Sequence, residues 1–351
     1  MKIDENITLA PFTTFKIGGP ADFFCSVTSE DDVREAVEFS KKKKIPFFVI
    51  GGGSNILISD KGFPGLVILN ELKGIGYSVQ GIENTAPSTL NPAPFSIVSA
   101  AAGESWDGLV EYTVSKGFSG LENLSSIPGT VGASAVQNLG AYGVTAEQFI
   151  HSVRAFDTQE MKFVLLFNAD CGFEYRDSMF KHEKGRYVIV RVDFKLEKGG
   201  KANIEYKDLK EYFAAKKINA PSSAEVREAV ISIRAGKLPD WKLWGTAGSF
   251  FKNPVVSAQE YATLKNKYPD LPGFPEANGK IKLALAWILD NICHAKGMMN
   301  GNVGTYEKQA LVFVAKPGAT AAEVVELAQE LMKRVKDATG VTIEGEVEWV
   351  N

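Results

Sequence analysis

A single serine lies beside residue types that favour anions in the stretch GTAGSFFKNP, residues 245–254. Ser249 lies between a glycine-rich turn and two phenylalanines, and Lys252 and Asn253 follow it. A serine hydroxyl is a weak acid, so it can give up a proton only when it is held against a strongly basic atom with water excluded. The residues alone favour a simpler use, a serine that caps a helix or stabilises a turn.

Two glycine-rich segments, GGGSN (51–55) and IPGTVGASAVQNLGAYG (127–143), offer backbone amides to an anion. Clustered amide dipoles can hold a diphosphate without lysine, and small residues let the backbone approach a flat ligand closely. Ser54 and Asn55 add side-chain donors. The first segment does not match the dinucleotide fingerprint GxGxxG, because the sequence ILIS, which is not helical, follows it. A plain string of turns is the structural alternative.

The elements that would position these groups alternate between strands and helices. A capping box at Ser29 and Asp32 opens a predicted helix over 29–43, and Trp106, Leu109 and Val110 lie on one face of another that ends at Gly117. Further helices are predicted over 222–236, 283–296 and 320–340, and a capping box at Ser257 and Glu260 opens one more. Strands are predicted over 22–28, 45–50, 56–59, 65–70, 96–102, 151–157, 162–167, 187–195, 309–315 and 341–350.

Two of these strands carry an alternating pattern, which is typical of a strand with one buried face. Over 187–195, Val188, Val190, Val192 and Phe194 alternate with Ile189, Arg191 and Asp193. Over 341–350, Ile343, Val347 and Trp349 alternate with Glu344, Glu346 and Glu348. The Pro- and Asn-rich stretch 81–94 shows no period and is predicted to be an exposed loop or hairpin tip.

The length, the net charge and the numbers of cysteines and histidines exclude several classes of protein. A chain of 351 residues suggests two or three domains, and a formal net charge of −3 makes bulk attraction to nucleic acid unexpected. The three cysteines form no CxxC pair and the three histidines lack ligand spacing, so no metal site is expected and a reducing cytoplasm fits best. No apolar run has the length of a signal peptide or of a membrane span.

Eight motifs together resemble the UDP-N-acetylenolpyruvoylglucosamine reductases (MurB), in the form with the longer third domain. They span nearly the whole chain in the family's order, and their combination is highly specific. The matching pieces are PFTTFKIGGPA (11–21), IGGGSNILI (50–58), GLENLSSIPGTVGASAVQNLGAYG (120–143), FEYRDSMFK (173–181), KLPD (237–240), GSFFKNP (248–254), KQALV (308–312) and IEGEVEW (343–349).

The resemblance implies an α+β flavoprotein of three domains, with a two-domain FAD-binding unit of the vanillyl-alcohol-oxidase-like type and a C-terminal α/β substrate domain. The expected bounds are 1–72 (joined by the strand 343–351), 73–237 and 238–342. The implied enzyme is a cytoplasmic monomer that binds FAD non-covalently between its first two domains and accepts hydride from NADPH. It reduces the enolpyruvyl group of a UDP-sugar to UDP-N-acetylmuramate for peptidoglycan synthesis, and it binds neither membrane nor nucleic acid.

The resemblance also assigns three catalytic residues. Hydride addition drives negative charge toward a carboxylate that is already an anion, so the site needs a fixed cation and strong donors. Arg176 in EYRDS is the implied cation, although its sequence alone favours a surface ion pair with Asp177. Glu346 is the implied donor to the developing charge, whereas Glu344 and Glu348 are expected to face solvent. Ser249 is implied to protonate the carbon, with Phe250 and Phe251 excluding water.

The remaining family positions hold the cofactor and the nucleotide. Phe274 departs from the family's usual lid tyrosine, and a phenyl ring can still stack on uracil; Tyr261 and Tyr268 are alternatives. The implied substrate-binding residues are Tyr206, Lys237, Asn253, Gln309 and Phe274. The implied FAD-binding residues are Gly51, Gly52, Gly53, Ser54, Asn55, Ile127, Pro128, Gly129, Gly132, Ala133, Gln137, Asn138, Gly140, Ala141 and Tyr142.

Two other functions fit parts of the sequence. An FAD-dependent oxidase of the same fold is disfavoured, because such enzymes often attach flavin through His or Cys and neither glycine-rich segment contains one. A non-catalytic module that binds nucleotide sugars would keep Lys237 and Asn253 but would not need the serine, arginine and glutamate. A yellow protein that NADPH bleaches and the enolpyruvyl sugar recolours would distinguish the reductase from both.

Overall fold

The computed structural model describes residues 1–79, 95–276 and 278–351, and the predicted loop at 81–94 lies outside them. The chain divides into two compact units, each with its own hydrophobic core. Unit 1 comprises Met1–Asn6, Asp22–Gly52 and Pro64–Gly236, and unit 2 comprises Ile7–Ala21, Gly53–Phe63 and Lys237–Asn351. The division of the chain into three domains stays a prediction.

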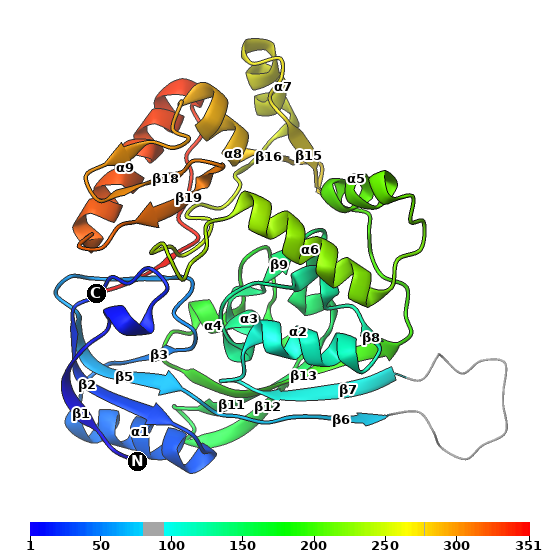
Figure 1. Ribbon diagram of the computed structural model, residues 1–351. Helices are drawn as coiled ribbons and strands as arrows, with labels where there is room; N and C mark the ends of the chain where they lie inside the picture. Colours follow the sequence, from blue (N-terminus) through cyan, green and yellow to red (C-terminus); the bar gives the residue numbers. More distant parts are fainter. Residues whose placement is uncertain (80–94, 277) are drawn as a thin grey trace, which may run out of the picture. The chain divides into compact units, whose positions relative to one another are not determined.

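A four-stranded sheet and one long helix form the first layer of unit 1 (Figure 1). Helix α1 (Glu30–Lys43) begins with the predicted capping box, in which the Ser29 and Asp32 side chains each accept a backbone N–H of the other residue. Its apolar face, with Val33 and Val37, packs against the sheet. The strand order is β1 (Asp4–Thr8), β2 (Pro20–Val27), β5 (Phe63–Asn70) and β3 (Phe47–Ile50).

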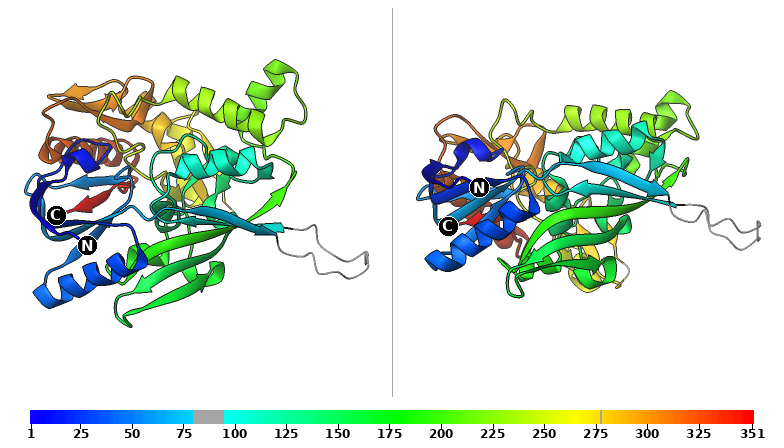
Figure 2. Two further views of the ribbon diagram at one scale, coloured as in Figure 1. Left: turned by 60° about the horizontal axis from the view of Figure 1, so that its bottom comes forward. Right: turned by 90° about the horizontal axis from the view of Figure 1, so that it is seen from below.

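A larger antiparallel sheet, whose green strands run side by side in both views of Figure 2, forms the centre of unit 1. One of its faces packs against α2 (Trp106–Ser115) and α3 (Val131–Gln137), and the other shares the core beneath α1. Trp106, Leu109 and Val110 of α2 are buried, as predicted. The strand order is β12 (Lys162–Phe167), β11 (Ile150–Asp157), β13 (Tyr187–Lys198), β7 (Phe95–Ala101) and β6 (Ile75–Val79), and β8 (Phe118–Ser119) also pairs with β13.

Strand β13 is buried on both faces, so the prediction of one exposed face is wrong. The β11–β13 register shifts at Val190, and this bulge moves the following residues to the opposite face. Val188 and Val190 therefore lie in the core beneath α1, whereas Val192 lies in the core beneath α2. Asp193 is buried too, and its carboxylate accepts hydrogen bonds from Ser152 and Arg191.

Two further helices and several short elements complete unit 1. Helices α5 and α6 pack on each other through a small core that includes Phe213 and Val230. The remaining elements are β9 (Gly140–Ala141), β10 (Val144–Thr145), α4 (Met179–His182), α5 (Lys207–Lys216) and α6 (Ser223–Lys237).

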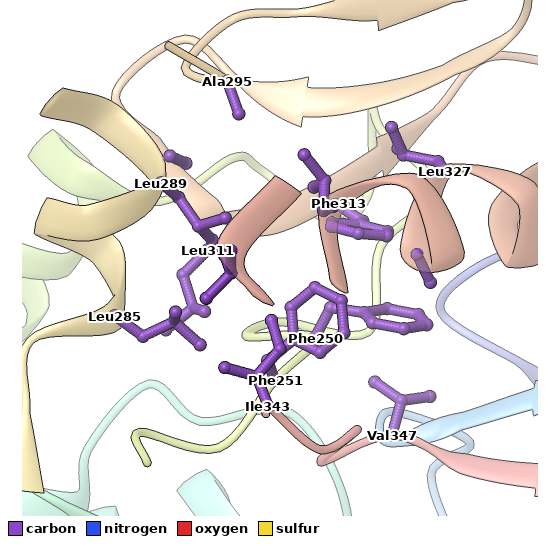
Figure 3. Close-up of a cluster of buried hydrophobic side chains, with 14 of the residues drawn as sticks. Phe250, Phe251, Leu285, Leu289, Ala295, Leu311, Phe313, Leu327, Ile343 and Val347 are labelled. Carbon is purple, nitrogen blue, oxygen red and sulfur yellow. The ribbon is translucent and has the colours of Figure 1, made fainter. Parts of the chain in front are cut away.

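Unit 2 has an aromatic core and three small sheets. The Phe250 ring stacks on Phe313 at 4.2 Å with 10° between the planes, and Figure 3 shows both rings beside Ile343 and Val347. The sheets are β14 (Val255–Val256), β16 (Ile281–Leu283) and β15 (Gly273–Pro275); β17 (Met299–Asn300), β18 (Val303–Tyr306) and β19 (Gln309–Ala315); and the parallel pair β20 (Glu348–Val350) and β4 (Ile56–Ile58). Helix α7 spans Ala258–Lys267 and α9 spans Ala321–Thr339.

The N-terminus of helix α9 is capped by its own residues and by Asp60, which is distant in the sequence. Its N-terminus carries a capping box between Thr320 and Glu323, and the Asp60 carboxylate accepts the N–H groups of Ala321 and Ala322 at 2.8 and 3.0 Å. A carboxylate stabilises a helix N-terminus because the first amides have no partner within the helix. The predicted helix over 320–340 is confirmed. None of the helices in the described residues is both long enough and apolar enough to span a bilayer.

Two predictions for unit 2 are wrong in length. The helix predicted over 283–296 is limited to α8 (Leu285–Trp287) and a π-turn (Ile288–Ile292), because the chain turns at His294 with a φ of 49° and carries Ala295 into the core. The strand predicted over 341–350 is regular only in β20. Trp349 is 43% exposed instead of buried.

Candidate active site

Ser249 lies on an extended segment that runs beside β19 in unit 2. Gly245 exchanges two backbone hydrogen bonds with Ala315, and the Phe250 N–H donates to the Leu311 carbonyl at 2.9 Å. Gly248 supplies a left-handed turn (φ 75°) directly before the serine. Ser249 is half-buried, while Phe250 and Phe251 are 3% and 1% exposed. The two rings thus anchor the segment in the core, whereas the prediction placed them as a water barrier over the hydroxyl.

Glu346 lies on the backbone that pairs with the other side of this segment. Its N–H donates to the Phe250 carbonyl at 2.8 Å, and the Lys252 N–H donates to the Glu344 carbonyl at 3.0 Å. Two candidate catalytic residues, 97 positions apart in the sequence, are therefore held on adjacent strand-like segments. Glu346 is half-buried and Glu344 is exposed, as expected for Glu344. Glu348 was also expected to face solvent, but it is half-buried, because it lies in β20, which pairs with β4.

Asn55 contacts the Glu346 segment from the opposite side. Its side-chain Nδ2 donates to the Glu346 carbonyl at 3.1 Å, and its own carbonyl accepts the Glu348 N–H at 3.0 Å. Gly53, two residues before Asn55, has a φ of 59°, and a Cβ there would lie 2.0 Å from the Phe12 carbonyl oxygen. Gly53, Ser54 and Asn55, which were predicted to bind FAD, thus belong to unit 2.

The substrate-binding candidates in unit 2 have varied surroundings. The Asn253 Oδ1 accepts the Leu285 N–H at 3.1 Å and so caps α8, and the Gln309 Oε1 accepts the Leu311 N–H at 3.4 Å. Lys237 is exposed, and Phe274 on β15 is 53% exposed. The hydroxyls of the alternatives to Phe274, Tyr261 and Tyr268, donate to the Leu271 and Ala338 carbonyls.

Arg176 lies in unit 1 at the tip of a two-residue turn. Glu174 and Asp177 exchange backbone hydrogen bonds on either side of it, and Arg176 itself has a φ of 57°. Its Nη2 donates to the Gly140 carbonyl at 2.5 Å, while the Asp177 carboxylate contacts His182 at 2.9 Å. A left-handed non-glycine residue stores backbone strain, and such strain concentrates at functional sites. The turn therefore holds a cation against the second glycine-rich segment.

The two glycine-rich segments touch within unit 1. A Cβ on Gly52 would lie 2.7 Å from the Gly129 Cα, and a Cβ on Gly51 would lie 2.2 Å from the Thr130 Oγ1. A Cβ on Gly132 would lie 2.9 Å from the Ala102 Cβ. Only glycine allows this contact between two uncharged backbones, and the half-buried Ile127, Pro128 and Gly129 lie beside it. The arrangement suits a flat anionic ligand held by main-chain groups.

Asn138 and Tyr142 serve the protein's own structure. The Asn138 Nδ2 donates to Glu147 and to the Glu174 carbonyl at 2.7 and 2.8 Å, which ties the segment to the Arg176 turn. Tyr142 packs edge-on against the Tyr206 ring at 5.3 Å, and burial raises the pKa of Tyr142 to about 12. Tyr206 itself is 44% exposed. Gln137 is buried, Gly140 and Ala141 are half-buried, and Ala133 is exposed.

Three charged residues that were absent from the prediction hold the start of the second glycine-rich segment. Asp107 accepts the Ser126 N–H at 2.5 Å and pairs with both terminal nitrogens of Arg227, and the Arg234 Nε donates to the Ser126 carbonyl at 3.2 Å. Ser126 has a φ of 59°. Both arginines lie on α6, for which the sequence predicted a helix over 222–236 but no role for these side chains. The contacts become visible only when α6 is placed beside α2.

Comparison with known proteins defines the class first. A model of the FAD binding domain matches residues 21–160, which include both glycine-rich segments of unit 1. A crystal structure of UDP-N-acetylenolpyruvylglucosamine reductase (MurB) from Thermus caldophilus has the same fold, with a TM-score of 0.67, 22% identity and full coverage of both chains. The chain is therefore a flavoprotein, and the predicted mixed α and β flavoprotein fold is confirmed.

The remaining matches define the family. A model described as UDP-N-acetylenolpyruvoylglucosamine reductase, C-terminal domain, matches residues 240–350. The reductase of that name from Ralstonia nicotianae is 41% identical over 345 residues, 98% of both chains. That from Neisseria gonorrhoeae is 44% identical over 344 residues, 97% of this chain and 96% of the relative. The chain belongs to the UDP-N-acetylenolpyruvoylglucosamine reductase (MurB) family.

Proposed function

We propose that the chain is an NADPH-dependent flavoenzyme that reduces UDP-N-acetylglucosamine enolpyruvate to UDP-N-acetylmuramate for peptidoglycan synthesis. The observation that carries the proposal is the identity of 41% with the Ralstonia nicotianae reductase over 98% of both chains. We further propose that the enzyme acts as a monomer in the cytoplasm and serves cell shape and division through the cell wall.

FAD fits the residues of unit 1 and would be held mainly by main-chain groups. The contact of Gly51 and Gly52 with Gly129 and Thr130 leaves no room for side chains, and no charged side chain occurs within 51–55 or 127–143. When bound, FAD supplies a hydride taken from NADPH to the methylene carbon of the enolpyruvyl group. We propose that the residues of 51–54 and 127–142 predicted from the resemblance hold this cofactor non-covalently.

The three candidate catalytic residues answer the demands of this reaction. Arg176 presents a guanidinium, whose fork suits the substrate carboxylate and offsets the charge that develops on it. Glu346 donates a hydrogen bond to the same charge when its carboxyl is protonated. Ser249 then gives its proton to the carbon next to the carboxylate. The fixed backbone of the Ser249 segment supports this role, because a weak acid must be held in place to act.

The nucleotide part of the substrate needs one cation and several neutral donors. Lys237 supplies the charge for the diphosphate, and Tyr206, Asn253 and Gln309 supply hydrogen-bonding groups. The exposed Phe274 ring is proposed to stack on uracil.

Absorbance spectroscopy of the purified protein tests the proposal in two halves. The expected result is a yellow protein that NADPH bleaches under anaerobic conditions and that regains its colour when the enolpyruvyl sugar is added. Colour that returns with oxygen but not with the sugar would indicate an oxidase. A folded protein with no affinity for flavin would contradict the proposal outright.

A further inference from the structure

Asn55 occupies a position between two backbone pairings in unit 2. On one side, β20 pairs in parallel with β4, which begins one residue after Asn55. On the other side, Gly345 and Glu346 pair with Phe251 and Phe250. Glu346 thus lies where one pairing ends and the other begins, two residues before the start of β20.

The Asn55 side chain supplies the hydrogen bond that the backbone lacks at this junction. The Glu346 N–H donates to the Phe250 carbonyl at 2.8 Å, and its carbonyl accepts the Asn55 Nδ2 at 3.1 Å. The Asn55 carbonyl also accepts the Glu348 N–H at 3.0 Å. Both peptide groups that flank the Glu346 side chain are therefore engaged, one by the serine segment and the other by Asn55.

We infer that Asn55 is a positioning residue, whose side-chain amide holds the Glu346 peptide in register with the Ser249 segment. This inference rests on the proposed function for the chemistry of Glu346, but the contact itself does not. It differs from the predicted use of the Asn55 side chain as a donor to FAD, because one N–H of that amide is directed at the Glu346 carbonyl. A general acid works only within hydrogen-bonding reach of its target, so a loose peptide would reduce its efficiency.

Asn55→Asp is the sharpest test, because it keeps the size of the side chain and replaces the N–H donor by a carboxylate oxygen that repels the Glu346 carbonyl. Asn168→Asp is the matched control. Asn168 is also half-buried and donates its amide to two backbone carbonyls, those of Glu147 and Ile150. The Asn168 variant should therefore show the general cost of an Asn→Asp exchange.

Hydrogen–deuterium exchange of the FAD-loaded protein measures the contact without activity. In Asn55→Asp, peptides that cover 344–351 should exchange at least about tenfold faster, whereas peptides from α9 should not change. In Asn168→Asp, the exchange of 344–351 should equal that of the wild type. Unchanged exchange of 344–351 in Asn55→Asp would overturn the inference.

The two half-reactions and the affinity for FAD separate positioning from cofactor binding. Asn55→Asp should bind FAD and be reduced by NADPH within about threefold of the wild type, but its reoxidation by the enolpyruvyl sugar should slow by about tenfold or more. The pH profile of reoxidation should change as it does in Glu346→Gln. The double variant should be no slower than Glu346→Gln alone, because both changes act through one group.

Two results would count against the inference in different ways. Weaker FAD binding with normal reoxidation at saturating FAD would make Asn55 a cofactor ligand, as the sequence had suggested. Additive losses in the double variant would show that Asn55 acts separately from Glu346. If Glu346→Gln itself left reoxidation and its pH profile unchanged, the proposed role of Glu346 would fail, while the exchange measurement would still decide whether Asn55 holds the segment.

Discussion

The molecule holds its two sets of candidate catalytic groups by different means. In unit 2, Ser249 and Glu346 lie on backbone segments that pair with each other, and the Ser249 segment also pairs with β19 and carries the Phe250 ring that stacks on Phe313. In unit 1, Arg176 lies at the tip of a strained turn and donates to the Gly140 carbonyl, and the neighbouring glycine-rich segment is held by Asp107, Arg227 and Arg234.

The difference matches what each group must do. A neutral hydroxyl is a poor acid unless its position is fixed, and main-chain pairing over an apolar core gives a rigid support that does not depend on pH or salt. Arg176 is held by a hydrogen bond to the Gly140 carbonyl, and the ion pair that holds the neighbouring glycine-rich segment is screened by salt and depends on protonation. The proton donors should therefore tolerate changes of solution that disturb the unit 1 segment.

Ser249→Ala should have the largest effect and tests the unit 2 side of the comparison. The fold and flavin reduction by NADPH should be retained, because the hydroxyl is not needed for either. Reoxidation by the enolpyruvyl sugar should slow by about 10²–10⁴-fold, the usual contribution of a proton donor. Stopped-flow absorbance measures both half-reactions, and reoxidation at a rate near that of the wild type would remove Ser249 from the mechanism.

Arg176→Lys is expected to cost about 10²-fold in reoxidation, because lysine keeps the charge but loses the planar fork. The loss should appear in the rate of reoxidation at saturating sugar. Arg154→Lys is the control, since Arg154 makes a two-pronged pair with Glu30 within the same unit. Equal losses in the two variants would show a structural role for both arginines.

Gly52→Ala tests the contact between the glycine-rich segments. The added Cβ would lie 2.7 Å from the Gly129 Cα, so one backbone must move. The dissociation constant for FAD, measured by flavin fluorescence, should rise by about tenfold or more. Gly76→Ala is the control, because a Cβ there meets no atom of the described residues within 4 Å and its φ is not in the left-handed range. Normal FAD affinity in Gly52→Ala would mean that this contact does not shape the cofactor site.

Asp107→Asn should have the smallest effect and concerns stability. Burial alone would raise the pKa of the Asp107 carboxyl, but hydrogen bonds from Arg227 and the Ser126 N–H lower it on balance. A lowered pKa in the folded state stabilises the protein above the ordinary pKa, and this stability is lost as the pH falls through the folded-state value. Asp107→Asn should therefore lower the free energy of unfolding by less than about 1 kcal/mol at pH 7, because the pair is partly exposed.

Urea unfolding at several pH values measures this effect. The difference from the wild type should shrink below about pH 4, where the carboxylate is protonated in the unfolded chain. A difference that stayed constant from pH 7 to pH 3 would show that the charge of Asp107 does not stabilise the segment. In unit 2, Phe250→Leu should give a loss of about 1–2 kcal/mol that does not vary with pH, because packing carries no charge.

Local signals predicted much of this fold. The capping boxes at Ser29 and Ser257 and the apolar face of α2 lie where the sequence placed them. So do β7, β11, β12 and β13 of the larger sheet, whereas β6 and β8 were not predicted. Three features depend on contacts between distant residues and have no local signal. These are the bulge at Val190, the turn at His294 and the irregular backbone before β20.

The candidate site shows the same division between what the sequence predicts and what depends on contacts between distant residues. The resemblance supplied the candidate residues, and the structure adds what surrounds each of them. Asn138, Asn253 and Asn55 were predicted to contact ligands, but each side chain is engaged by the protein's own backbone. A sequence gives the chemistry of an amide and not its partner, because the partner can lie hundreds of positions away.

The pairing of β4 with β20, together with the cap that Asp60 places on α9, has a consequence for synthesis on the ribosome. Strand β4 is translated early, but its partner emerges about 290 residues later, or about 15–60 s at about 5–20 residues per second. For that interval the nascent chain carries an unpaired apolar strand, although every residue of unit 1 has been added once residue 236 is translated. We expect this stretch of the nascent chain to be the one that chaperones bind.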